Sequence, residues 1–235
     1  MPGEVLIAAA LVAASFLCGS VPWALLIGRW ARGVDVRASG SGNIGATNAF
    51  RVLGPRWGSL VLFLDFAKGT VPMLLALWLS WAWPYQDLVL VLVALAAILG
   101  HSYSPWVGLK GGKGFATGAG AVTGLTPWSV IVILPIFLIV ALSSRWVSLG
   151  SIVSATVYPF ITLGFLYTIP LPWQGPITVL FAFVAGALVV WRHRSNIRRI
   201  IDGTESRATF GIFKPDPPKA APTSGDDTRA TGEDE

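Results

Sequence analysis

Long apolar runs alternate with short polar stretches along almost the whole chain. Six runs are long enough to cross a bilayer, the shorter ones with help from flanking residues: 5–28, 58–83, 88–100, 128–142, 147–168 and 177–191. Because hydrocarbon offers no partner to a free backbone N–H or C=O group, each run is expected to be helical. The pattern therefore predicts an all-α, polytopic integral membrane protein.

Composition supports this class and excludes an ordinary soluble domain. Hydrophobic residues make up 54% of the 235 residues and charged residues only 12%, whereas soluble domains carry roughly twice that charged fraction. The mean hydropathy is +0.66. The first apolar run has no basic segment before it and no small-residue cleavage site after it, so it is expected to remain as a span. Cys18 is the one cysteine in the sequence, which excludes a disulfide within the chain.

Lysine and arginine are distributed so that the two sides of the membrane can be assigned. They are absent from residues 81–87, 124–128 and 168–176, and present in 29–56, 110–113, 143–151 and 192–207. The positive-inside rule places the second group in the cytoplasm, and the sides alternate if residues 112–143 cross twice, with a break at Thr126 before Pro127. We predict about seven transmembrane helices, with the N-terminus outside and the C-terminus cytoplasmic. The short limb, 112–125, is expected to cross a thinned bilayer or to form a deep re-entrant element.

The chain changes character after Phe213. Residues 214–235 are rich in Pro, Ala, Thr, Ser, Gly and acidic side chains, which cannot bury enough apolar surface to order a segment. They predict a disordered cytoplasmic tail, and residues 1–213 form a single predicted transmembrane domain. The net charge of +5 comes from the cytoplasmic connections, where it favours the anionic headgroups of membrane lipids as partners, and not nucleic acid.

Three polar cassettes interrupt the apolar pattern where runs begin or end: residues 39–48, 101–114 and 192–199. The first two are rich in glycine and the third is rich in arginine. In the predicted topology all three lie on the cytoplasmic side. Each alone is explained by an ordinary loop or a basic helix end, whereas three on one side predict a composite site for a phosphate-bearing substrate at the lipid surface.

The second cassette ends in Lys110-Gly111-Gly112-Lys113-Gly114, directly before the short limb. Glycines let the backbone approach an anion, consecutive N–H groups can converge on it, and a helix N-terminus adds favourable potential. Lys113 adds a full positive charge. The segment is not a Walker A loop, because Gly114 follows Lys113 where that motif has Ser or Thr.

The first cassette offers amide and hydroxyl groups on a glycine-rich backbone. Asn43, Thr47 and Asn48 carry short hydrogen-bonding side chains, and Arg51 lies three residues after Asn48. If the chain is helical from Gly45, Asn48 and Arg51 share a face. An arginine placed there can hold a phosphate with two parallel hydrogen bonds.

The third cassette ends the last predicted helix. His193 and Asn196 are three residues apart, so both can face the bundle, and His193 can donate a hydrogen bond to phosphate or transfer a proton. The arginines around them are expected to anchor the helix end in lipid headgroups more than to bind substrate: Arg192, Arg194, Arg198 and Arg199.

Two further pairs of polar residues lie near the cassettes. Asp65 and Lys68, three residues apart in the second apolar run, can pair, which lowers the cost of burying either charge. A structural role and a catalytic role are both open for this pair. Ser148 and Ser151 fall in a predicted cytoplasmic turn, where they can bind the anion or cap a helix.

These motifs together resemble the bacterial acyl-phosphate-dependent glycerol-3-phosphate acyltransferases, a membrane-integral family without a His-x4-Asp motif. The matching segments are GSGNIGATN with Arg51, LDFAKG, GHSYSPW with KGGKG, and RHRSNIRR followed by Gly203-Thr204-Glu205, in order from residue 19 to 205. The resemblance implies a seven-helix fold and transfer of a fatty acyl group from acyl phosphate to the 1-hydroxyl of sn-glycerol 3-phosphate. The implied products are lysophosphatidic acid (1-acyl-sn-glycerol 3-phosphate) and inorganic phosphate, in phospholipid biosynthesis at the cytoplasmic face of the bacterial inner membrane.

The resemblance also assigns roles to individual residues. Catalytic roles are implied for Lys113, Ser148, His193 and Asn196. Substrate binding is implied for Ser41, Asn43, Thr47, Asn48, Arg51, His101, Ser104, Gly111, Gly112 and Ser151. Gly150 departs slightly from the family pattern, in which alanine or serine is also usual, and this does not alter the assignment.

The chemistry of the residues limits the mechanism. Trp106 and Arg198 stand where a carboxylate would orient His101 or His193, so no His-x4-Asp dyad is present. Acyl phosphate is an activated mixed anhydride, and the hypothesis is therefore direct attack by the glycerol hydroxyl, with the glycine backbone, Lys113 and the asparagines stabilising charge on the departing phosphate. The base is left open between a substrate phosphate and His193. With two histidines, one cysteine and no HExxH pattern, neither a metal nor another cofactor is expected.

Two other functions stay open at the level of sequence. A transporter for a phosphorylated solute would use similar basic surfaces, but it should show inverted repeats, and no convincing internal repeat is present. A lipid-phosphate phosphatase would need a histidine nucleophile with a partner acid, and neither His101 nor His193 has an adjacent carboxylate.

Overall fold

Every regular element is helical in the computed structural model, which describes residues 2–208. The α-helices are α1 (Pro2–Ser20), α2 (Trp23–Arg32), α3 (Ala46–Leu53), α4 (Pro55–Leu79), α5 (Gln86–Ser102), α6 (Phe115–Leu125), α7 (Pro127–Ser144), α8 (Val147–Thr168), α9 (Pro176–Arg192) and α10 (Arg194–Ile201). Two short 3-10 turns, Val36–Ala38 and Pro105–Val107, lie in the connections. The all-α prediction is confirmed for residues 2–208, and the predicted tail, 214–235, lies outside the described residues.

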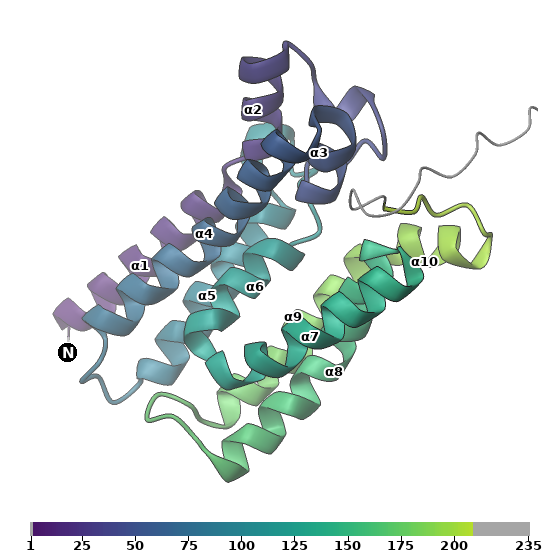
Figure 1. The fold of residues 1–235 in the computed structure, drawn as a ribbon. Helices are drawn as coiled ribbons and strands as arrows, with labels where there is room; N and C mark the ends of the chain where they lie inside the picture. The colour runs from purple at the N-terminus through teal and green to yellow at the C-terminus, as the bar shows by residue number, and fades with distance from the viewer. Residues whose placement is uncertain (1, 209–235) are drawn as a thin grey trace, which may run out of the picture.

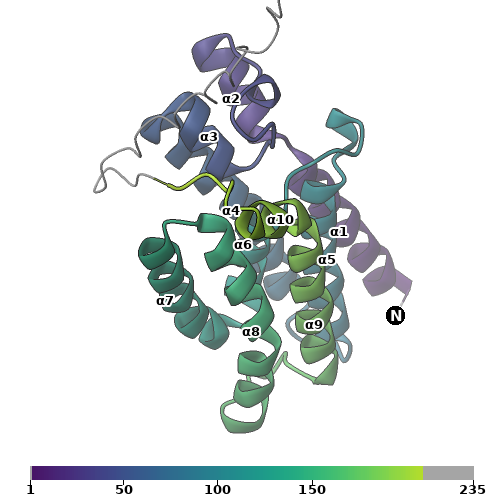
Figure 2. The ribbon, with the colours of Figure 1, turned by 90° about the vertical axis from the view of Figure 1, so that its right-hand side faces the viewer.

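The long helices lie side by side in two groups (Figure 1). In the first group α1 packs on α5 and α4 packs on α6, while α8 lies between α7 and α9 in the second. Contacts between α5 and α9 join the groups. The short helices α2, α3 and α10 gather at one end, which the second view shows from the side (Figure 2). All three cassettes are at that end, because they adjoin α3, the α5–α6 connection and the α9–α10 junction.

Within residues 2–208, five helices are long and apolar enough to cross a membrane, or six if α9 and α10, bent by 53°, form one span. α6 is apolar but has only 11 residues, which gives about 17 Å of helix against a hydrocarbon core of about 30 Å. The short limb predicted at 112–125 is therefore a real helix, although it is too short to span an undistorted bilayer by itself.

The first apolar run is not one continuous helix. α1 ends at Ser20 and α2 begins at Trp23, because Pro22 has no N–H group for the helical ladder and restricts the residue before it. The structure thus corrects the prediction of a single helix over residues 5–28. Beyond the break α2 is two-sided, with Ile27 buried and Trp30 77% exposed, as expected for a helix at a membrane interface.

Glycines allow the closest contacts between helices. A Cβ atom on Gly69 of α4 would collide with the carbonyl oxygen of Thr117 in α6, and one on Gly100 of α5 would collide with the carbonyl oxygen of Phe16 in α1. Small residues commonly set such distances in lipid, where close backbone packing drives helix association.

We expect Gly69→Ala to destabilise the protein by about 1–3 kcal/mol, because the added methyl group forces α4 and α6 apart. Gly164→Ala in α8 is the matched control, since nothing lies within 4 Å of a Cβ atom there. Thermal unfolding in detergent should show a lower midpoint for Gly69→Ala alone. Equal midpoints for the two variants would contradict the close contact between α4 and α6.

Candidate active site

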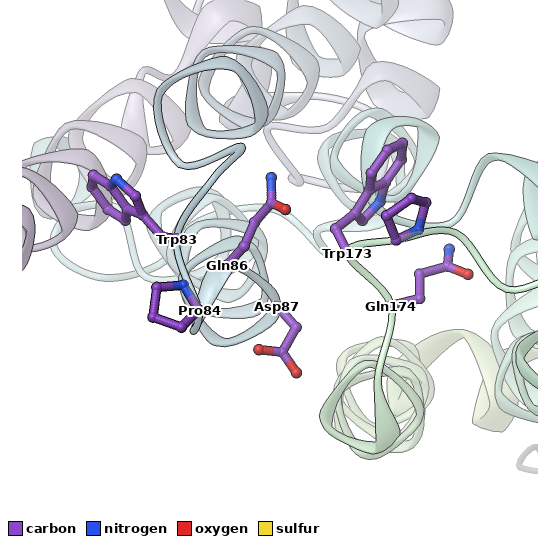
Figure 3. A pocket seen from close by; sticks show the side chains of 7 residues that line it. Trp83, Pro84, Gln86, Asp87, Trp173 and Gln174 are labelled. Carbon is purple, nitrogen blue, oxygen red and sulfur yellow. The ribbon is translucent and has the colours of Figure 1, made fainter.

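A hollow of about 190 Å³ (Figure 3) lies at the end of the bundle where α4 and α8 end, away from the cassettes. Its lining residues come from the α4–α5 connection, the first turn of α5 and the α8–α9 connection: Trp83, Pro84, Gln86, Asp87, Pro172, Trp173 and Gln174. One of these side chains is acidic and none is basic, so the hollow offers no cation to a phosphate. The cassette end is therefore the candidate site.

The glycine loop, residues 110–114, joins the end of α5 to the start of α6. The backbone N–H groups of Gly111 and Gly112 donate to the carbonyl oxygens of Ser102 and His101, both at 3.1 Å. Neither glycine has room for a Cβ atom, because the backbone and ring of the α5 terminus occupy that space. The loop is thus seated tightly on the last turn of α5.

Arg192 holds the same loop from the other side. Its Nη2 atom donates to the carbonyl oxygens of Ser102, Gly111 and Gly112 at 3.1, 3.0 and 2.7 Å. The structure corrects the prediction that Arg192 is a headgroup anchor: as the last residue of α9 it lies beside the end of α5 and points inward. Its neighbour Arg194 is exposed, as an anchor would be.

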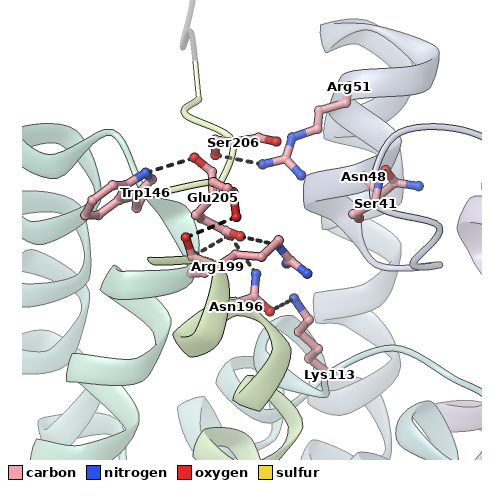
Figure 4. Close-up of polar contacts among 11 residues, drawn as sticks. Ser41, Asn48, Arg51, Lys113, Trp146, Asn196, Arg199, Glu205 and Ser206 are labelled. Atoms are coloured by element: carbon pink, nitrogen blue, oxygen red, sulfur yellow. Dashed lines mark hydrogen bonds and ion pairs between the residues drawn. The ribbon is translucent and has the colours of Figure 1, made fainter. Parts of the chain in front are cut away.

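Lys113 enters a polar network that links the second and third cassettes (Figure 4). Its Nζ atom donates to Asn196 Oδ1. Asn196 Nδ2 and Ser148 Oγ each donate to Glu205 Oε1 at 2.7 Å, and Arg199 Nε pairs with Glu205 Oε2 at 2.7 Å. Asn196 and Glu205 are buried, at 4% and 8% exposed. The network brings the glycine loop, α8 and α10 together around one carboxylate.

Electrostatics in this network favour a charged pair of opposite sign. Burial raises the pKa of the Glu205 carboxyl, but its hydrogen bonds from Ser148, Asn196 and Arg199 outweigh burial and hold the pKa below its ordinary value. Burial lowers the pKa of Lys113 to about 8, although Glu205 opposes that shift. Lys113 is therefore charged at neutral pH and titrates just above it.

The first cassette reaches this network through Arg51. The side chain is exposed on α3, and its Nη2 atom donates to the carbonyl oxygen of Ser206 at 3.1 Å. Trp146 Nε1, from the start of α8, donates to the carbonyl oxygen of Glu205 at 3.3 Å. Figure 4 shows Arg51 and Lys113 approaching this region from different elements. Residues 203–206 therefore form a strap across the site.

Asn48 serves the first cassette from within. It is 1% exposed, and its Nδ2 atom donates to the carbonyl oxygens of Val36 and Ser39 at 2.8 and 3.2 Å. Its Oδ1 atom accepts from the N–H group of Ser41 at 2.8 Å. α3 begins at Ala46 as expected. Asn48 points into the loop while Arg51 points out, so the two side chains do not share a face, and the amide atoms of Asn48 are used to shape the loop.

Asn43 also braces the first cassette. Its Oδ1 atom accepts from the N–H group of Gly45 at 2.9 Å, directly before α3. This short-range bond turns the chain into the helix, as asparagine side chains commonly do. The cassette is therefore ordered by its own amides before any ligand is considered.

Other residues assigned by the motifs lie around the network. Ser104 is buried and its Oγ atom donates to the carbonyl oxygen of Ser20 at the end of α1, at 2.6 Å. Ser151 Oγ donates to the carbonyl oxygen one turn earlier in α8 at 3.0 Å. His193 is buried at the junction of α9 and α10, with Nδ1 2.8 Å from the carbonyl oxygen one turn earlier. Thr47 is half-buried in the first turn of α3.

Glu205 and Arg199 are site residues that the sequence analysis did not single out. Glu205 entered only as part of the matching GTE segment, and Arg199 was assigned to headgroups. Gly203, with φ +66°, reverses the chain after α10 and returns Glu205 to the helix, where its N–H group donates to the carbonyl oxygen of Arg199 at 3.0 Å. An acid two residues after a glycine, shortly beyond a run of arginines, is the signal that could have identified this pair.

The sequence profile of the family described as glycerol-3-phosphate acyltransferase matches residues 9–203. This chain belongs to that family. It is 44% identical over 200 residues to the glycerol-3-phosphate acyltransferase of Anaeromyxobacter sp. (strain Fw109-5), which covers 84% of this chain and 94% of the relative. It is 43% identical over 197 residues to that of Geobacter sulfurreducens, covering 84% of this chain and 95% of the relative.

The fold of this acyltransferase-family chain is also similar to solved structures. A crystal structure of PlsY (YgiH), an integral membrane glycerol 3-phosphate acyltransferase in its glycerol 3-phosphate form, superposes with a TM-score of 0.75 and 38% identity. The match covers 87% of this chain and 98% of that chain. The lysophosphatidic acid form of PlsY gives a TM-score of 0.73. The family predicted from the motifs is thereby confirmed, and so is an integral membrane fold.

Proposed function

We propose that this protein transfers a fatty acyl group from acyl phosphate to the 1-hydroxyl of sn-glycerol 3-phosphate, yielding lysophosphatidic acid and inorganic phosphate for phospholipid biosynthesis. The observation that carries the proposal is the meeting of Lys113, Asn196, Arg199 and a tightly seated glycine loop at one end of an apolar bundle. Two of these side chains, Lys113 and Arg199, are cations, which suits phosphate-bearing substrates.

The topology proposed with this function has seven crossings. They are the five long spans, the bent α9–α10 pair and α6 in a locally thinned bilayer. Arginines and lysines are concentrated at the cassette end, which supports a cytoplasmic site, an outside N-terminus and a cytoplasmic C-terminus in the bacterial inner membrane. Membrane lipids then surround the bundle, and acyl phosphate reaches the site from the cytoplasmic leaflet.

In the proposed reaction the glycerol oxygen attacks the acyl carbonyl carbon directly. A C–O bond forms there while the bond between that carbon and the phosphate oxygen breaks, and the hydroxyl proton leaves with the phosphate or through a base. Lys113 stabilises charge on the departing phosphate, in a role like that of an oxyanion-hole donor. The N–H groups of Gly111 and Gly112 are bound to the end of α5, so these glycines contribute by seating the loop that places Lys113. Because no covalent enzyme intermediate is needed, Ser148 acts as a hydrogen-bond donor and not as a nucleophile.

Glycerol 3-phosphate is assigned to the other side of the network. Arg51, together with Ser41 and Thr47 at the edge of the first cassette, is proposed to hold its phosphate, and Asn196 its glycerol hydroxyls. A carbonyl oxygen can only accept, so the 2.8 Å contact of His193 Nδ1 places the proton on that atom. His193 Nε2 then carries no proton and can accept one, so His193 and a substrate phosphate are the two candidate bases.

The supporting residues are proposed to act through the backbone that they hold. Asn43 and Asn48 fix the first cassette, and His101, Ser104 and Ser151 fix the ends of α5 and α8 around the loop and strap. Their contribution to substrate binding is thus the placement of Arg51 and Lys113.

Purified protein supplied with palmitoyl phosphate and labelled glycerol 3-phosphate tests the function. Labelled lysophosphatidic acid and an equal amount of inorganic phosphate are expected. Uptake of intact label into vesicles without product would identify a transporter, and labelled free glycerol would identify a phosphatase. Either result without lysophosphatidic acid overturns the proposal.

A further inference from the structure

α4 carries a buried ion pair directly behind the glycine loop. Asp65 Oδ1 and Lys68 Nζ are 2.8 Å apart, and the side chains are 1% and 3% exposed. Lys68 Nζ also donates to the carbonyl oxygen of Val21 at 2.8 Å, at the break between α1 and α2. A buried pair of this kind contributes little net stability compared with apolar residues of the same size, because desolvation offsets the attraction. Stability alone is thus a weak reason for this pair.

His101 lies between the ion pair and the loop. Its Nδ1 atom is 3.8 Å from Asp65 Oδ1, and its side chain is 5% exposed. Apart from the Lys68 ion pair, the Asp65 oxygens have no hydrogen-bond partner among the described residues, and neither has His101 Nδ1. Unpaired buried acceptors and donors are costly, and here a carboxylate and an imidazole nitrogen that can pair face each other.

The other edge of the imidazole touches the loop. A Cβ atom on Gly112 would collide with His101 Nε2, so the ring and the loop backbone are in direct contact. The carbonyl oxygen of His101 also accepts from the N–H group of Gly112. With Arg192 bound to the opposite side of the loop, the position of the ring determines where Gly112, and hence Lys113, can lie.

We infer that Asp65 is a positioning residue for the glycine loop and that it acts through His101. The carboxylate orients the Nδ1–H group of the imidazole, the ring supports Gly112, and the loop then presents Lys113 to substrate phosphate. Lys68 pairs with the carboxylate and joins it to the α1–α2 break. This role rests on the proposed function of the loop and adds residues from the membrane interior to it.

The test is a double-mutant cycle on the full-length purified protein, with kcat and both KM values measured. Asp65→Asn is expected to lower kcat/KM by about 10- to 100-fold, since a small displacement of a positioning group has effects of that size. Gly112→Ala, which perturbs the loop directly, serves as the reference variant. Asp65→Asn should raise the KM of whichever substrate is affected by Gly112→Ala, and the KM of the other substrate should stay within twofold of wild type. In a His101→Asn background, the Asp65 substitution should change kcat/KM by less than twofold, because the intermediary is already lost.

Two further variants separate positioning from folding. Asp65→Leu combined with Lys68→Met removes both charges, so no unpaired ion remains to unfold the bundle, and it should show the same kinetic loss at a near-normal melting midpoint. Ser129→Ala breaks a buried hydroxyl pair with Thr162, 3.1 Å apart and far from the loop, and should lower the midpoint without changing kinetics.

The outcomes are distinguishable from failure of the proposed function. Wild-type protein that makes no lysophosphatidic acid overturns the function and this role with it. If the wild type is active but the effects of the Asp65 and His101 substitutions on kcat/KM multiply independently, the positioning role alone is overturned. The same holds if the variant with both Asp65→Leu and Lys68→Met has the same kinetics as Ser129→Ala.

Discussion

Lys113→Ala is expected to lower kcat/KM by about 100- to 1000-fold, which is the usual cost of removing one charge-stabilising donor from a transition state. Lys113 is the cation that the glycine loop carries into the network, where its Nζ atom meets Asn196 Oδ1. Its loss also leaves Glu205 with less positive charge nearby. A purified-enzyme assay with both substrates at saturation and below KM measures the change, and a variant within threefold of wild type would refute this role.

The titration of Lys113 supplies an independent readout of the same prediction. Because burial lowers its pKa to about 8, the ammonium is present below that pH and is lost above it. The kcat/KM of the wild type, which reports the free enzyme, should therefore fall as pH rises through about 8. Lys113→Arg is the matched control, since its guanidinium does not titrate in this range and the alkaline fall should be absent.

Helix positions could be predicted from the sequence because lipid leaves the backbone so few alternatives. α8 has the bounds expected from its apolar run, and α7 begins at Pro127, where a break was predicted. The break inside the first run was missed, although Pro22 is visible in the sequence, because an apolar stretch around a proline reads as a kinked span. Hydropathy registers the residues that meet lipid, and it does not register where two helices share one run.

The sequence was enough to predict which segments form the site, but not which side chains contact one another within it. Glycine spacing located the loop, since the tight seat of Gly111 and Gly112 on α5 needs residues without Cβ atoms. Arg192 and Arg199 look alike in sequence, yet one holds loop carbonyls and the other a carboxylate. The two arginines lie on either side of the 53° bend between α9 and α10, and hydropathy does not show such a bend.

Glu205 carries the second large expected effect. Its carboxylate accepts from Ser148, Asn196 and Arg199, so Glu205→Ala leaves three donors, one of them charged, without an acceptor in a buried position. Breaking such a network costs about 3–5 kcal/mol, and the strap then loses its side-chain contact with Ser148 of α8. We expect a lower melting midpoint and a loss of activity of at least about 100-fold, because Asn196 and Ser148 lose their orientation.

A matched acid and a charge-balanced pair make this prediction specific. Asp202→Ala removes an exposed acid three residues earlier, whose contact with Arg198 is 4.0 Å long, and exposed pairs of this kind contribute little; its activity and midpoint should match wild type. Glu205→Gln with Arg199→Gln keeps hydrogen-bonding groups and removes both charges, so the fold should recover more than the activity. Full activity in that double variant would mean that the carboxylate only balances Arg199, whereas persistent loss at a restored midpoint would establish that it orients the groups that meet the substrate.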